Sequence, residues 1–126
     1  MPTENNHFNS LVRLLLPPEI FEYFEIIRID IKEKEVHVHI DEKNIKPEGY
    51  ELVKLISKGF HKSVTIQDFP IRDKAMFLHI RRRRWFSEST NKTVERDWEL
   101  VAKGTRLTKE FAIFLKGIYR ELSDKQ

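Results

Sequence analysis

The stretch IIRIDIKEKEVHVHIDEK, residues 26–43, decides the fold. Apolar and polar side chains alternate on both sides of a short charged link at residues 32–35. This period of two predicts two β-strands joined as an antiparallel hairpin. We expect the aliphatic side chains to face the core and the polar ones to face solvent, the inward set being Ile27, Ile29, Ile31, Val36, Val38 and Ile40.

Further strands are predicted downstream. One lies in KSVTIQDFPI (residues 62–71) and the next in KAMFLHIRRRRWF (residues 74–86), with a turn at Arg72 and Asp73 between them. A third, short strand is predicted around residues 98–101. The chain therefore contains a second hairpin after the first.

Helices are predicted at both ends of this region. FNSLVRLLLPPEIFEYFE (residues 8–25) favours a short N-terminal helix, which Pro17 and Pro18 interrupt. Residues 108–123 favour an amphipathic C-terminal helix that begins at Thr108, a good N-cap. We therefore predict a single α+β domain over residues 9–126, with a small, mainly antiparallel sheet of hairpins, and a disordered segment over residues 1–8.

The composition narrows the class of protein. The chain has 126 residues, of which 40% are hydrophobic and 34% are charged, and this balance is typical of a folded domain. It has no cysteine, so disulfides and thiolate metal sites are excluded. The first residues lack the pattern of a signal peptide, and no apolar run approaches the roughly 20 residues that span a bilayer. We expect a cytoplasmic protein without a membrane partner.

Positive charge is concentrated at the C-terminal end. The formal net charge is +3 for the chain, but −4 over residues 1–50 and +5 over residues 81–126. The positive part begins with four consecutive arginines, Arg81, Arg82, Arg83 and Arg84, followed by Trp85. Such an asymmetry predicts an anionic partner.

The arginine run poses a geometric problem. If a strand continues through Arg84, then Arg81 and Arg83 point to one face and Arg82 and Arg84 to the other. Both faces cannot belong to the core. We therefore expect the strand to leave the sheet near Ile80, as a projecting arm or an edge.

The chemistry of the run favours double-stranded DNA as the partner. Guanidinium groups match phosphate oxygens in pairs, Trp85 offers a ring that stacks on a base, and a two-stranded ribbon fits a major groove. The basic residues Lys103, Arg106 and Lys109 lie near the start of the last helix, where a docked phosphate would offset the cost of Lys109 beside the positive end of the helix dipole. The alternative is a solvated face of arginines with Trp85 in the core.

No pattern predicts catalysis, a metal or a cofactor. His37 and His39 share one face of a strand, and a metal site would need further ligands such as His61 or His79. Carboxylates are scattered, and neither a phosphate-cradling glycine loop nor a nucleophile elbow is present in the sequence. We predict a binding module that is not an enzyme.

Four stretches resemble the N-terminal region protein of a group of bacterial insertion-sequence transposases, the IS-Aon type. They are LLLPPEIFEYFEI, EVHVHIDEKNI, SKGFHKSVTIQDFPIRDKAMFLHIRRRRW and RDWELVAKGTRLTKEFAIFLK, within roughly residues 10–120. The resemblance implies a non-catalytic module that recognises the inverted-repeat ends of the element, with the nuclease on a separate or downstream reading frame. Within the matching segments the DNA-contacting candidates are Arg81, Arg82, Arg83, Arg84, Trp85, Lys103, Thr105, Arg106 and Lys109.

The order of elements is also similar to that of zinc-ribbon-type transposase N-terminal domains. The two knuckles would fall near residues 44–50 and 87–93, and neither contains cysteine. We therefore predict a zinc-ribbon-like fold without metal, held by its apolar core.

Two other functions stay open on the sequence. The apolar stripe of the last helix, with Phe111, Phe114 and Ile118, could dock on the catalytic part of a transposase or on a second copy in a homodimer. The same arginine and tryptophan chemistry would also serve an RNA-binding module.

Overall fold

The computed structural model describes residues 10–11, 13–14, 16–104 and 109–124. The predicted disordered segment 1–8 lies outside these residues. The elements, in chain order, are α2 (Ile20–Tyr23), β1 (Phe24–Ile31), β2 (Glu35–Glu42), β3 (Ile56–Phe60), β4 (Val64–Ile71), β5 (Lys74–Arg81), β6 (Arg83–Ser87), β7 (Lys92–Val94), α3 (Trp98–Gly104) and α4 (Lys109–Asp124). The predicted α+β class is confirmed, with a short N-terminal helix, a C-terminal helix and mostly antiparallel strands.

The first sheet has four strands in the order β1-β2-β5-β4. Both predicted hairpins are present, since β1 pairs with β2 and β4 pairs with β5, each antiparallel. The sequence did not predict that β2 and β5 pair in parallel, which joins the two hairpins into one sheet. A parallel pair needs a long connection, and residues 43–73 supply it.

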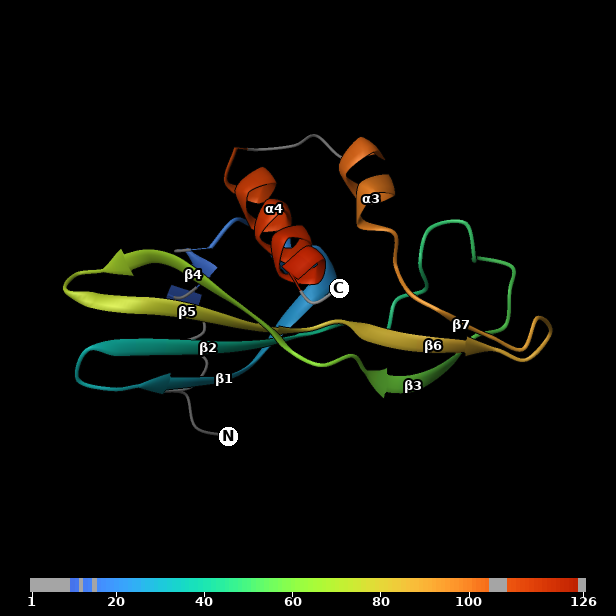
Figure 1. The fold of residues 1–126 in the computed structure, drawn as a ribbon, viewed down its shortest axis with the longest axis horizontal. Helices are drawn as coiled ribbons and strands as arrows, with labels where there is room; N and C mark the ends of the chain where they lie inside the picture. The colour runs from blue at the N-terminus through green and yellow to red at the C-terminus, as the bar shows by residue number, and fades with distance from the viewer. Residues whose placement is uncertain (1–9, 12, 15, 105–108, 125–126) are drawn as a thin grey trace.

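Helix α4 packs on one face of this sheet (Figure 1). Phe111, Phe114 and Ile118 are each at most 4% exposed and belong to the same core cluster as Val38 and Leu78. The prediction that these three residues form a partner-binding surface is therefore wrong. The four-stranded sheet leaves one apolar face to be covered, and the chain's own last helix covers it.

Two local predictions also need correction. Two residues that were predicted to face the core do not. The register of β1 shifts between Ile26 and Arg28, so Ile27 lies in a bulge and is 51% exposed, and Ile31 at the end of β1 is 54% exposed. Residues 98–101 belong to helix α3, not to a strand. Asp97 explains the helix, because its carboxylate accepts hydrogen bonds from the backbone N–H groups of Glu99 and Leu100 and caps the first turn.

The second sheet has three strands in the order β3-β6-β7 and lies beside the first along the long axis of the molecule (Figure 1). The chain leaves the first sheet at Arg81, as predicted, and enters the second at Arg83. The predicted projecting arm or edge is wrong, since β6 is the central strand and has a partner on each side. The arginine run therefore connects two sheets.

Candidate nucleic-acid interface

The arginine run distributes its side chains over different surfaces. Arg81 and Arg83 point the same way, as predicted, because both guanidinium groups lie over the Phe60 ring, 4.2 and 4.7 Å from its centroid. Arg82 and Arg84 belong to the other side, since side chains alternate along an extended chain. The four positive charges therefore do not form one continuous row.

Arg81 is neutralised by the neighbouring strand. Its Nε and Nη2 donate to the two carboxylate oxygens of Asp41 at 2.7 and 2.5 Å, a bidentate pair across the parallel β2–β5 ladder. The hydrogen bonds to Asp41 hold the pKa of Arg81 above its ordinary value. Arg81 consequently offers less charge to an external anion than the sequence suggests.

Trp85 is 1% exposed and belongs to the core, as the alternative interpretation had it. Its indole Nε1 donates to the Asn44 side-chain oxygen at 2.9 Å. Stacking of a base on this ring, expected from the sequence, is wrong for this structure because no face of the ring is open. We name the side of the second sheet that carries Arg83, Trp85 and Ser87 the Trp85 face.

The Trp85 face is held together by Arg96, which sequence reasoning missed. Arg96 is 3% exposed, and its guanidinium donates to Glu42 at 2.7 Å, to Glu48 at 2.9 Å and to the Ile45 carbonyl. Burial raises the pKa of Glu42 above its ordinary value, although its hydrogen bonds from Arg96 and from the Arg83 backbone N–H oppose that shift. The group is a structural ion-pair network. Glu42 itself is 1% exposed.

The opposite side of the second sheet is different, and we name it the Arg84 face. Register places Ile56 opposite Phe86 and Phe86 opposite Thr93, so these residues share one side. Period two adds the remaining members, and the face consists of Ile56, Lys58, Arg84, Phe86 and Thr93. Arg84, Lys58 and Thr93 are exposed, and Phe86 is half-buried.

The positive charge on the Arg84 face lacks acidic partners. Among the described residues, the Arg84 guanidinium donates only to a neutral acceptor, the Lys58 carbonyl, at 3.3 Å. Within the described part of the chain, neither Arg84 nor Lys58 forms an ion pair with a carboxylate. Lys62, also exposed, lies two residues beyond the end of β3. Side chains arranged in this way can bind phosphate oxygens.

The second predicted basic group cannot be placed against this face. Thr105 and Arg106 lie outside the described residues. Lys103 falls in α3 and Lys109 is the first residue of α4, as predicted, but their side chains also lie outside the described part. That these residues lie close to the arginine run remains a prediction.

The histidines form a stacked ladder on the open side of the first sheet. The His37 ring lies 5.1 Å from Phe77 and 5.0 Å from His79, and His79 lies 4.6 Å from His39, all nearly parallel. Their nitrogens bond to each other and to Glu35, Asp30 and Thr65. No group of three or more possible ligands that could hold a metal ion occurs among the residues that the structure describes.

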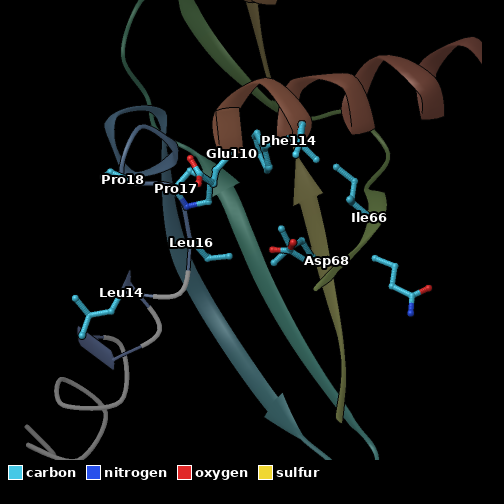
Figure 2. Close-up of a pocket in the computed structure, with 11 residues that line it drawn as sticks. Leu14, Leu16, Pro17, Pro18, Ile66, Asp68, Glu110 and Phe114 are labelled. Atoms are coloured by element: carbon cyan, nitrogen blue, oxygen red, sulfur yellow. The ribbon is translucent and has the colours of Figure 1, made fainter. Parts of the chain in front are cut away.

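A groove of about 310 Å³ lies between the N-terminal segment, β4 and the first turns of α4 (Figure 2). Figure 2 shows Leu14, Pro17, Ile66 and Phe114 around it, with Asp68 and Glu110 as its labelled acids. An acidic rim does not favour a polyanion. The groove is thus distinct in chemistry from the Arg84 face.

None of the helices in the described ranges is long and apolar enough to cross a membrane. The resemblance to the transposase module stays a prediction. No family model, no curated protein and no solved structure matches this chain.

Proposed function

We propose that the chain is a nucleic-acid-binding module that docks the phosphate backbone of double-stranded DNA on the Arg84 face. The observation that carries this proposal is the contrast in pairing along one run of arginines. Arg81 has a carboxylate partner, whereas Arg84 and its neighbour Lys58 have none among the described residues. An exposed cation held by a neutral carbonyl is already oriented and keeps its full charge for a phosphate.

The resemblance stated above gives this activity a setting. In it, the module is the non-catalytic N-terminal part of an insertion-sequence transposase, works in the cytoplasm at the nucleoid, and binds the terminal inverted repeats. The catalytic part of the transposase is the expected protein partner, and a homodimer is the alternative. Neither partner would dock on the apolar stripe of Phe111, Phe114 and Ile118, because the sheet covers it.

Titration of a fluorescent duplex at several salt concentrations tests the proposal. Each neutralised phosphate contributes about −0.9 to the slope of log affinity against log salt. Arg84 and Lys58 on the Arg84 face, together with the exposed Lys62 beyond the end of β3, therefore predict a slope of about −3. A slope of about −4 to −5 would require the basic residues at 103–109 as well. Absence of measurable affinity at low salt would reject the proposal.

A double variant locates the contact. Lys58→Ala with Arg84→Ala should weaken binding for all sequences and make the slope shallower by about 2 units, since two phosphate contacts are lost. The matched control is Lys34→Ala with Lys116→Ala, which also removes two exposed positive charges, one in the turn between β1 and β2 and one on α4. If the double variant binds like the control, the contact surface lies elsewhere. Competition with duplex RNA separates an RNA-binding module from a DNA-binding one.

A further inference from the structure

Arg82 is the least satisfied buried cation that the structure describes. The residue is 8% exposed, yet its Nε has no hydrogen-bond partner among the residues that the structure describes. Its shortest ion-pair contact, from Nη1 to Glu95 Oε2, is 3.7 Å, well beyond the 2.7–2.9 Å of a charge-assisted hydrogen bond. A buried guanidinium normally has its donors filled, so the Arg82 Nε–H is a donor that an external anion could use.

Other basic groups converge on the same place. His61 Nε2 lies 2.7 Å from Glu95 Oε2, and the backbone N–H of His61 donates to the Arg82 carbonyl at 2.8 Å. Arg84 is close enough for its charge to act on the His61 ring. The Glu95 side chain is half-exposed, so it can swing out into solvent.

We propose that Arg82, Arg84 and His61 form a site for one phosphate group, and that the Glu95 carboxylate occupies this site in the free protein. The inference rests on the proposed function and deepens it, because it names the residues that hold one phosphate of the bound nucleic acid. A phosphodiester carries negatively charged oxygens, as the Glu95 carboxylate does, but it is not tethered to the chain at the end of β7. It can therefore approach the two guanidinium groups closely and satisfy them in pairs.

Proton uptake accompanies such an exchange. In the free protein burial lowers the pKa of His61, Glu95 opposes that shift, and the charges of Arg82 and Arg84 add to it. A bound phosphate takes over the role of Glu95 beside the ring and also neutralises Arg82 and Arg84, whose charges lower this pKa, so the pKa of His61 rises on binding. Binding should therefore tighten as the pH falls from 8 to 6, and His61→Gln should flatten that dependence.

Glu95→Gln is the decisive variant, because it removes the competing charge and keeps the shape of the side chain. In this variant the phosphate no longer competes with a tethered carboxylate for His61 and Arg82, so duplex binding should tighten about fivefold. Glu88→Gln is the matched control, since Glu88 is exposed in the turn between β6 and β7 and changes the net charge equally. Thermal melting of both variants confirms that they fold.

The outcomes separate this inference from the function on which it rests. Tighter binding by Glu95→Gln than by Glu88→Gln supports the phosphate site. Equal binding by the two variants overturns the site and leaves duplex binding intact. If the wild type binds no duplex at low salt, both ideas fail.

The source of the phosphate is distinguished by three probes. Duplexes with and without 5′-terminal phosphates, and inorganic phosphate alone, are titrated against wild type and Glu95→Gln. A backbone site predicts the same gain with both duplexes and little with inorganic phosphate. A gain confined to the 5′-phosphorylated duplex, or to inorganic phosphate, would overturn the assignment to the backbone.

Discussion

Arg82 and Arg96 are both buried arginines that lie next to the second sheet, just before β6 and just after β7, but their donors are paired to very different degrees. Arg96 donates to two carboxylates and a backbone carbonyl on the Trp85 side. Arg82 reaches one carboxylate at 3.7 Å and leaves its Nε unpaired. The difference teaches that buried arginines of one chain can take two different roles. Some cations stabilise the fold, and others stay available to an external anion.

The largest effect is expected where the network is complete. Arg96→Met leaves Glu42 buried without its ion partner and should lower the free energy of unfolding by about 3–5 kcal/mol. Urea unfolding followed by circular dichroism measures the change. A loss below about 1 kcal/mol would mean that Glu42 finds another partner or takes up a proton at little cost.

Asn44→Ala tests the same Trp85 face through a neutral contact. Its side-chain oxygen accepts the hydrogen bond from Trp85 Nε1, and the indole is 1% exposed. Removing the acceptor should cost about 1–3 kcal/mol, because the buried N–H loses its partner. Urea unfolding of the variant gives the value, and no change would show that water replaces Asn44.

A smaller effect on the free energy of unfolding is expected from a change of pH. Burial lowers the pKa values of His61 and His79 below their ordinary value, so the unfolded chain binds protons more readily than the folded one. The contribution of these groups to stability is therefore complete above about pH 6.5 and declines as the pH falls toward their folded-state values. We expect the double variant His61→Gln/His79→Gln to lose less stability than the wild type between pH 7.5 and 5.5. An equal loss in both proteins would contradict this assignment.

The smallest effect on stability is expected at Arg82 itself. Arg82→Met replaces a poorly paired buried charge by an apolar side chain of similar length, so the free energy of unfolding should change by less than about 1 kcal/mol. The charge of Arg82 gives Glu42 only minor support. A loss as large as that of Arg96→Met would show that Arg82 is a structural cation, and the contrast between the two arginines would then disappear.

Much of the fold could be predicted from the sequence because local patterns decide it. The alternation over residues 26–43 gave the first hairpin, and apolar spacing gave helix α4 within a residue of its start. The parallel pairing of β2 and β5 could not be read in this way, because it depends on how two hairpins meet across a long connection. The bulge at Ile27 was not predicted either, because an inserted residue can break a period of two without a glycine or proline to mark it in the sequence.

The candidate site was less predictable than the fold. Composition located the basic segment, and period two correctly paired Arg81 with Arg83. The sequence did not reveal that Asp41, 40 positions away, neutralises Arg81, or that Asn44 fixes Trp85 inside. Such pairings join residues far apart in the chain, and no local pattern encodes them.

One NMR measurement tests the central claim most directly: the side-chain N–H signals of the arginines and tryptophans, recorded while a duplex is added. The account predicts that the Nε–H signals of Arg82 and Arg84 shift, while those of Arg96 and the Trp85 indole stay in place. Shifts at Arg96 and Trp85 with none at Arg84 would contradict it, because the duplex would then be bound on the side that holds the fold together.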